Sequence, residues 1–363
     1  MLFKRKLEID KIKRVVVRGA NWVGDAVMTI PALRELRRVL PGAHLTLATR
    51  SSTAAIFENA DFVDDVIIYD RGSKALRATL RQIKTWRASS FDLAVLLQNA
   101  FDAALVGFGA RVPARLGYSV QRRGLLLTHR VALPKWRGER HEVYYYLNIV
   151  AELERLLYGR SEVMDREPIF GMTVSANRRD EAQALLRESG ARAGRPLVVI
   201  CPGSTNSRAK RWPAERFAAL ADKIVRELQA DVALIGSKDE FDVSVKVSSL
   251  MQETPLILTG RTDIAQAMAV LSLADVLVTN DTGPAHVAAS LDRPTLVIFG
   301  PTDPTTTRPF SSVAQVIRHA PECAPCMLRD CPIDHRCMTA IEPGEVFLRL
   351  KMLIKHRPVG VQA

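Results

Sequence analysis

An aspartate at the end of a glycine-bounded loop is the first residue of this sequence with a clear chemical use. Asp25 closes the loop Gly19-Ala20-Asn21-Trp22-Val23-Gly24, which follows an apolar run and precedes a helical pattern. The dipole of a helix N-terminus favours an ionised carboxylate, and such a carboxylate in a ligand-binding cleft can accept a proton as a general base. The same position also suits the N-cap of the helix. The residues alone leave both roles open.

The glycine spacing of this loop argues against two common nucleotide-binding motifs. Between Gly19 and Gly24 the middle glycine of the dinucleotide fingerprint is absent, and no Gly-Lys-Ser/Thr follows as in a P-loop. An NADP-dependent oxidoreductase stays in view as an alternative, because Thr-Arg-Ser-Ser at residues 49–52 could bind a 2′-phosphate after the second predicted strand.

Two loops in the second half of the chain suit a diphosphate. The first, CPGSTNSRAKRWP at residues 201–213, offers hydroxyl and amide groups from Ser204, Thr205 and Asn206. Lys210 and Arg211 add positive charge to the same loop. Such groups cradle phosphate oxygens, although serine, threonine and lysine also fill ordinary loops.

The second loop, NDTGPAH at residues 280–286, lies between a predicted strand and a predicted helix. Thr282 and Gly283 would bring backbone amides to the helix start, where phosphate binds well. His286 could reach that phosphate or be packed in the core. Asp281 would repel a phosphate, so we expect it to cap the helix or to orient loop amides and sugar hydroxyls.

Four of the five cysteines cluster near the C-terminal end in a C-x2-C-x4-C-x5-C pattern: Cys323, Cys326, Cys331 and Cys337. A structural zinc site is one interpretation of this cluster, because thiolates are good zinc ligands. Reduced free thiols are a second interpretation, and His335 could compete as a ligand. Disulfides fit less well in a chain without a secretory signal.

Two sets of alternating strands and helices must position these residues. Strands are predicted at 13–18, 44–49, 64–69, 92–97, 114–118, 196–201, 231–236, 255–260, 275–280 and 294–300. Helices are predicted in the second set at 213–228, 238–251, 264–273 and 283–291. Pro31 predicts that the helix after Asp25 begins near Thr29 or is kinked there. Short apolar strands alternating with helices are typical of parallel sheets covered on both faces.

Length and composition agree with two soluble domains. The chain has 363 residues, 47% hydrophobic and 25% charged, which suggests about two folded domains. The most apolar stretch is interrupted by polar residues, so no membrane-spanning helix is expected. The basic N-terminus is not followed by the apolar region of a secretory signal. The sequence therefore predicts a cytoplasmic protein.

Positive charge is concentrated in one part of the chain. The net charge is +12, and residues 71–140 hold 14 lysines and arginines against 3 acidic residues. Within this segment a helix is predicted at 73–88, with Lys74, Arg77, Arg81, Lys84 and Arg87 on one side and Leu76, Leu80, Ile83 and Trp86 on another. This pattern is typical of a helix lying on an anionic membrane surface. It also fits an ordinary helix that covers a sheet.

Several ordered motifs together resemble glycosyltransferase family 9 over nearly the whole chain. They are NWVGDAVMTIPALRELR, PGSTNSRAKRWP, GSKDE, NDTGPAHVAASLDRPTLVIFGPTDP and the cysteine cluster. The resemblance implies a GT-B fold, an α/β architecture of two Rossmann-like parallel-sheet domains facing a central cleft. We expect an acceptor-binding domain at residues 1–175 and a nucleotide-sugar domain at 176–342. A C-terminal helix within 343–363 is expected to pack back on the N-terminal domain.

The resemblance implies catalytic roles by motif. Asp25 would be the base that takes the proton of the acceptor hydroxyl, and Lys210 would neutralise charge on the ADP leaving group. Further donor-site residues are Ser204, Thr205, Asn206, Asp281, Thr282, Gly283 and His286, and either Asp239 or Glu240 would bind the ribose. Expected acceptor-site residues are Asn21, Trp22 and Gly24 beside Asp25, and Arg122 and Arg123 in the basic segment.

The implied reaction is inverting transfer of L-glycero-D-manno-heptose from ADP-heptose to the first heptose of the lipopolysaccharide inner core. The acceptor would be heptosyl-Kdo2-lipid A, with peripheral contact to the anionic inner face of the inner membrane. No metal is expected in catalysis, no nucleic-acid-binding module is recognised, and a monomer is expected. A family member with another nucleotide sugar or another core acceptor is the alternative.

Overall fold

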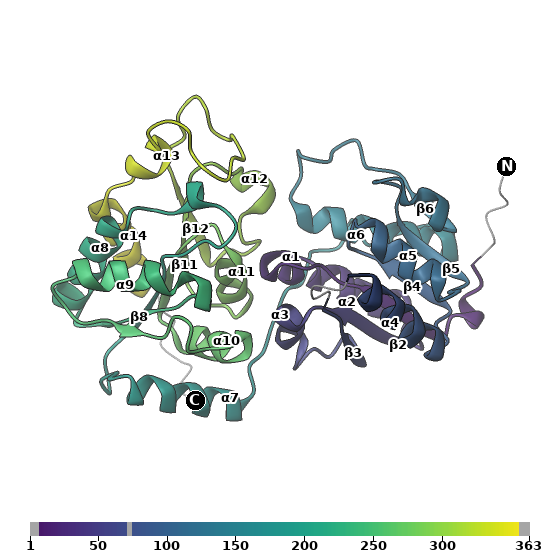
Figure 1. Ribbon diagram of the computed structural model, residues 1–363, viewed down its shortest axis with the longest axis horizontal. Helices are drawn as coiled ribbons and strands as arrows, with labels where there is room; N and C mark the ends of the chain where they lie inside the picture. The colour runs from purple at the N-terminus through teal and green to yellow at the C-terminus, as the bar shows by residue number, and fades with distance from the viewer. Residues whose placement is uncertain (1–6, 71–74, 356–363) are drawn as a thin grey trace. The chain divides into compact units, whose positions relative to one another are not determined.

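The computed structural model describes residues 7–70 and 75–355. The chain divides into two compact units, Met1–Phe170 and Gly171–Ala363, each built around its own sheet (Figure 1). The division falls a few residues before the boundary expected at residue 175. Because the two units are separate bodies, each is described by itself.

Six parallel strands form the sheet of the first unit, in the order β3-β2-β1-β4-β5-β6. Apolar, β-branched runs make these strands, and the central ones are buried on both faces. The strands are β1 (Arg14–Arg18), β2 (His44–Thr49), β3 (Asp65–Ile68), β4 (Leu93–Leu96), β5 (Ala114–Tyr118) and β6 (His129–Val131). The chain order reverses between β1 and β4, and in such sheets ligands bind at the strand ends beside this reversal.

Helices cover both faces of the first sheet (Figure 1). One layer holds α1 (Val23–Met28), α2 (Ile30–Val39) and α6 (Glu142–Tyr158), which contact one another. The short α3 (Ser51–Ala54) packs beside α1. The other layer holds α4 (Ala75–Ala88) and α5 (Phe101–Gly109), whose Trp86, Ala104 and Val106 pack on Val16 and Ala94 of the strands.

The second sheet repeats the plan of the first, in the order β12-β11-β10-β7-β8-β9. All its neighbouring pairs are parallel. The strands are β7 (Leu197–Cys201), β8 (Asp231–Leu234), β9 (Leu256–Ile257), β10 (Val276–Asn280), β11 (Thr295–Phe299) and β12 (Ala314–Arg318). Here the order reverses between β7 and β10.

The helices of the second unit divide between the two faces of its sheet. One layer holds α8 (Ala214–Leu228), α9 (Phe241–Leu250) and α14 (Pro343–Lys355), and the other holds α7 (Ala176–Glu188), α10 (Ile264–Leu273) and α11 (Gly283–Ser290). The short α12 (Pro304–Thr307) and α13 (Arg336–Thr339) lie in the connections that follow β11 and β12. A core of buried aliphatic and aromatic side chains joins α8 and α14 to the strands.

The described part of the C-terminal helix has one apolar side in the core of the second unit. The described part of α14 packs within the second unit, against α8, β10 and β11. Its Val346, Phe347 and Leu350 are buried in the core of that unit. The expected packing of this helix on the first domain stays a prediction, and residues 356–363 lie outside the described residues.

Two edge strands were missed by the sequence prediction, and the structure places the expected helix break at Thr29. β6 and β12, at one edge of each sheet, were not predicted because neither has a continuous apolar run. The helix predicted from Asp25 onward is split at Thr29, which joins α1 to α2. Pro31 lies in the first turn of α2, where its missing N–H leaves no hydrogen bond unmade.

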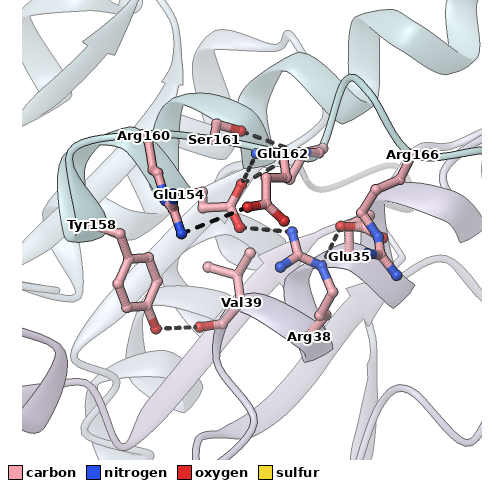
Figure 2. A network of polar contacts seen from close by, with 10 residues as sticks. Glu35, Arg38, Val39, Glu154, Tyr158, Arg160, Ser161, Glu162 and Arg166 are labelled. Atoms are coloured by element: carbon pink, nitrogen blue, oxygen red, sulfur yellow. Dashed lines mark hydrogen bonds and ion pairs between the residues drawn. The ribbon is translucent and has the colours of Figure 1, made fainter.

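A polar network ties the end of the first unit to its helices (Figure 2). Glu154 of α6 accepts hydrogen bonds from Arg38 of α2 at 2.7 Å and from the backbone N–H of Glu162 at 2.8 Å. Glu35 of α2 joins Arg38 to Arg166, at 2.7 and 3.1 Å. These contacts fix the segment that follows α6 onto α2 before the chain enters the second unit.

Within residues 7–70 and 75–355, none of the helices is both long enough and apolar enough to cross a membrane.

Candidate functional site

The reversal point of the second sheet brings together the two loops in which the sequence predicts diphosphate-binding residues. Asn280, the last residue of β10, joins them with its side-chain amide. Its Nδ2 donates to the carbonyl oxygens of Pro202 and Gly203 at 2.9 and 3.1 Å, and its Oδ1 accepts from the backbone N–H of Trp212 at 3.0 Å. Asn280 is fully buried. The loop after β7 is therefore held against the end of β10.

Lys210 and Asp281 form an ion pair across these loops. The Lys210 Nζ lies 2.7 Å from Asp281 Oδ2 and 3.2 Å from the Asp281 carbonyl oxygen. Thr302 donates its hydroxyl to the same Oδ2 at 2.7 Å. The carboxylate is buried, whereas the lysine remains partly exposed. Since an ammonium has three N–H donors, the pair orients Lys210 and leaves one donor for a ligand.

One of the two roles expected for Asp281, capping the helix, is wrong. Thr282, not Asp281, is the N-cap of α11, and its side chain makes no capping hydrogen bond. The Thr282 hydroxyl instead lies 3.1 Å from that of Thr279. Asp281 orients Lys210 through their ion pair, and its expected contacts with loop amides and sugar hydroxyls stay a prediction. Gly283 opens α11, and His286 is buried within the helix.

The loop after β7 is fixed by its own arginine. Arg211 donates from Nε and Nη2 to the Ser204 carbonyl oxygen at 3.2 and 3.0 Å. Ser204 is buried, whereas Thr205 and Asn206 are exposed at the surface. The two exposed side chains can reach a ligand, and Ser204 shapes the backbone that carries them.

The two acidic candidates for ribose binding differ in burial. Asp239 is exposed, and Glu240 is buried. Glu240 Oε2 accepts from the backbone N–H and the hydroxyl of Ser237, both at 2.9 Å. A side chain at position 203 would collide with the Glu240 carboxylate, so Gly203 leaves the space in which Glu240 lies. Glu240 thus lies against the loop after β7.

In the first unit, Asp25 lies in the opening turn of α1, whose N-cap is Trp22. Of the two roles that the sequence left open for Asp25, the N-cap is therefore wrong. The Tyr146 hydroxyl of α6 donates to Asp25 Oδ1 at 3.4 Å. Burial raises the pKa of Tyr146 well above its ordinary value, so the phenol stays protonated. Burial also raises the pKa of Glu142, with a smaller contribution from Asp25.

The expected acceptor residues lie in different environments. Trp22 is 57% exposed, and the Asn21 side chain accepts from the Tyr69 hydroxyl at 2.9 Å. Gly24 is the second residue of α1. Arg122 is exposed and has a left-handed backbone conformation.

Arg123 does not fit the role of a ligand-binding arginine. It is fully buried, and its guanidinium donates to the Tyr118 carbonyl oxygen at 2.8 Å, to Asn99 Oδ1 at 2.9 Å and to the Gln98 carbonyl oxygen. Burial lowers the pKa of Arg123 to about 10, so the group remains charged at neutral pH. Arg123 holds the loop after β4, and its donors are used inside the unit.

Arg18, the last residue of β1, was not expected at the site. It is fully buried, with its guanidinium carbon 3.3 Å from the centre of the Tyr69 ring. Its Nε donates to Gln98 at 3.1 Å. A charged residue that ends an otherwise apolar strand was the available signal. Arg18 lies on the ring of Tyr69, whose hydroxyl donates to Asn21 in the following loop.

The cysteine cluster is not assembled as a metal site. Among the described residues no group of three or more histidine, cysteine, aspartate or glutamate side chains could hold a metal ion. Burial raises the pKa of Cys337, and Cys331, Cys326 and Cys323 raise it further. All are free. The zinc site stays a prediction.

Comparison with known proteins gives the family. The profile of glycosyltransferase family 9 (heptosyltransferase) matches residues 79–336. The chain belongs to this family. Lipopolysaccharide heptosyltransferase 2 of Salmonella typhimurium is 29% identical over 315 residues, which are 84% of this chain and 88% of that protein. The oxidoreductase alternative finds no support among these similarities.

Solved structures agree with the fold of this family 9 glycosyltransferase. The structure of E. coli ADP-heptose lps heptosyltransferase II is 25% identical, covers 94% of this chain and 98% of its own, and has a TM-score of 0.79. A family 9 glycosyl transferase from Veillonella parvula is 22% identical, with a TM-score of 0.81 and coverage of 94% and 97%. The predicted GT-B architecture, with two Rossmann-like units, is confirmed.

Proposed function

We propose that this protein transfers L-glycero-D-manno-heptose from ADP-heptose to the first heptose of the lipopolysaccharide inner core. The observation that carries the proposal is the reversal point of the second sheet. There Lys210 lies beside the N-terminus of α11, an arrangement suited to a nucleotide diphosphate. The identity of the sugar and of the acceptor rests on the similarity to lipopolysaccharide heptosyltransferase 2.

In this proposal the reaction is a single inverting displacement at the anomeric carbon. Asp25 accepts the proton of the attacking hydroxyl, and Lys210 neutralises the charge that develops on ADP as it leaves. The ion pair with Asp281 supports this role, because it holds the ammonium in place before the substrate arrives. Preorganised donors of this kind can each contribute about 2.7 to 4 kcal/mol to transition-state stabilisation. Catalysis by these groups requires no metal.

The donor's ribose is assigned to Glu240 rather than Asp239. Glu240 is buried against Gly203, in the loop that would hold the diphosphate, and Ser237 fixes one of its two oxygens. The other oxygen is then available for a ribose hydroxyl. Asp239 is exposed.

We further propose that the first unit works against the anionic cytoplasmic face of the inner membrane. The exposed side of α4 holds Arg77, Arg81 and Lys84 together with Leu76 and Leu80, which are 74% and 56% exposed. Trp86 and Gln82 take the buried side instead. Two exposed leucines among basic residues support the membrane interpretation over an ordinary sheet-covering helix. Lys74 lies outside the described residues.

The zinc prediction has a direct measurement. Metal analysis of the purified protein, with and without serine in place of Cys323 and Cys326, would give about one zinc per chain that is lost in the variant. Absence of zinc, with all four thiols titrating as free, would remove this prediction without affecting the proposed reaction.

The experiment that tests the function is release of ADP from ADP-heptose by the purified protein, with and without heptosyl-Kdo2-lipid A. We expect release that depends on the acceptor, and mass spectrometry showing one added heptose. Release with a different core acceptor only would favour the alternative family 9 activity. The absence of release with this donor would exclude it.

A further inference from the structure

Arg137 is an exposed arginine held on a buried aromatic ring. It lies between β6 and α6, and its guanidinium carbon is 4.4 Å from the centre of the Tyr145 ring. Its Nη1 donates to the Tyr145 hydroxyl at 3.2 Å. A turn closes around it, with the Arg137 N–H donating to the Pro134 carbonyl oxygen at 3.1 Å. The side chain is therefore oriented before any ligand binds.

The ring beneath Arg137 is itself rigid. Tyr145 is 3% exposed and stacks on Tyr118, with the ring centres 4.2 Å apart. Asn99 Nδ2 donates to the Tyr145 hydroxyl at 2.6 Å, and Asn99 in turn accepts from the buried Arg123 at 2.9 Å. The support of Arg137 thus continues into the loop after β4, which borders the reversal point of the first sheet.

Arg137 lies in the neighbourhood of Asp25. The rings of Tyr145 and Tyr146 pack edge to face with their centres 6.0 Å apart, and the Tyr146 hydroxyl donates to Asp25. Burial has the largest effect on the pKa of Glu142 and raises it. Arg137 lowers this pKa and Asp25 raises it, so both groups are close enough to interact with Glu142. A saccharide whose hydroxyl meets Asp25 would bring its neighbouring groups within reach of Arg137.

The guanidinium has donors to spare. A guanidinium carries five N–H groups, and the structure uses one of them, on Tyr145. Arg137 contacts Tyr145 directly and lowers the pKa of Glu142. Its planar fork matches a carboxylate with two parallel hydrogen bonds. The buried Arg18 and Arg123 cannot serve in this way, since both are fully enclosed.

We propose that Arg137, fixed on Tyr145, binds a sugar-acid carboxylate of the acceptor next to the hydroxyl that reacts. This inference rests on the proposed function and deepens it, because it names the acceptor chemistry that the first unit recognises. The Kdo sugars of the expected acceptor carry such carboxylates. Arg137 takes the place that the sequence assigned to Arg123, whose guanidinium is enclosed.

The test is calorimetric binding of the delipidated heptosyl-Kdo2 saccharide to the full chain. Arg137→Met should raise the dissociation constant about tenfold, since it removes a charge-assisted hydrogen bond, and Arg137→Lys should lie between. The matched control is Arg130→Met, which removes the same charge from an exposed position on β6 and should bind as the unaltered protein does. A carboxyl-reduced saccharide should bind the unaltered protein and Arg137→Met equally.

Four outcomes would overturn the inference: no binding to the unaltered protein, equal binding by Arg137→Met, an equal loss in Arg130→Met, or a loss that persists with the reduced saccharide. Circular dichroism of each variant checks the fold, and Arg137→Gln repeats the test if Arg137→Met is unfolded. Binding does not require transfer. An unaltered protein that binds the saccharide through Arg137 but releases no ADP would therefore contradict the proposed function alone.

Discussion

Basic residues in this protein act in two ways, according to their burial. Arg18 and Arg123 are fully buried and donate to Gln98 and Asn99 in the loop after β4, so they stabilise the conformation of that loop. Lys210 and Arg137 are held by one neighbour each and keep donors directed outward. A fixed cation with unused donors is suited to a substrate anion, because little reorganisation is needed when the anion binds.

Substitution of Asp25 should slow sugar transfer without changing the affinity for the donor nucleotide. Asp25→Asn keeps the shape of the side chain but cannot take a proton, so we expect turnover to fall by about a hundredfold to ten-thousandfold. ADP affinity, measured by calorimetry, should stay unchanged because the donor loops belong to the other unit. Turnover equal to that of the unaltered protein would remove Asp25 from the base role.

Lys210→Ala should impair binding and transfer together. The variant loses the cation expected on the diphosphate and leaves the buried Asp281 carboxylate with Thr302 as its remaining side-chain partner. We expect a tenfold or greater rise in the ADP dissociation constant, from the loss of a charge-assisted hydrogen bond, and a lower kcat. Asp281→Asn is the control, since it keeps the Lys210 cation but removes the carboxylate that pairs with it. An unchanged ADP affinity in Lys210→Ala would mean that the diphosphate binds elsewhere.

At the scale of elements, α6 links the candidate site to the end of the first unit. Its first two turns carry Glu142, Tyr145 and Tyr146, which surround Asp25 and Arg137. Its last turns carry Glu154, which holds the following segment to α2 through Arg38 (Figure 2). The position of Tyr145 and Tyr146 thus depends on the contacts that Glu154 makes at the C-terminal end of α6.

Glu154→Gln should lower stability in a pH-dependent way. Burial acts to raise the pKa of Glu154, but hydrogen bonds from Ser161, Arg38 and Glu162 outweigh it and lower the pKa below its ordinary value. The ionised group therefore stabilises the fold above the pKa of the unfolded chain, and this contribution is lost as pH falls through the folded pKa. We expect denaturant unfolding to show a loss of about 1 to 3 kcal/mol at pH 7 that shrinks in acid. A difference independent of pH would contradict this account.

At the scale of the whole molecule, the sequence predicted the two doubly wound units and the loops at their strand ends. Periodicity and apolar runs suffice for this, because central parallel strands are buried on both faces. Short edge strands such as β6 (His129–Val131) escape prediction, since they lack a continuous apolar run. The roles of Arg123 and Asp281 also escaped, because burial and partner choice depend on contacts between segments far apart in the chain. The placement of α14 depends in the same way on packing against α8.

The uneven charge of the molecule leads to a last prediction, on membrane binding. Residues 71–140 carry most of the net charge of +12, and α4 exposes Arg77, Arg81, Lys84 and Arg87 together with Leu76 and Leu80. Replacing Arg77, Arg81 and Lys84 by glutamine should weaken binding to vesicles of anionic lipid by about 3 kcal/mol, or roughly a hundredfold, at about 1 kcal/mol for each charge. Leu76→Ser with Leu80→Ser should weaken binding at high salt, where screening leaves the apolar contribution. Glutamine at Arg179, Arg187 and Arg261, which are exposed in the second unit, is the control of equal charge. If that control loses as much affinity, the attraction comes from net charge alone and α4 is not the contact surface.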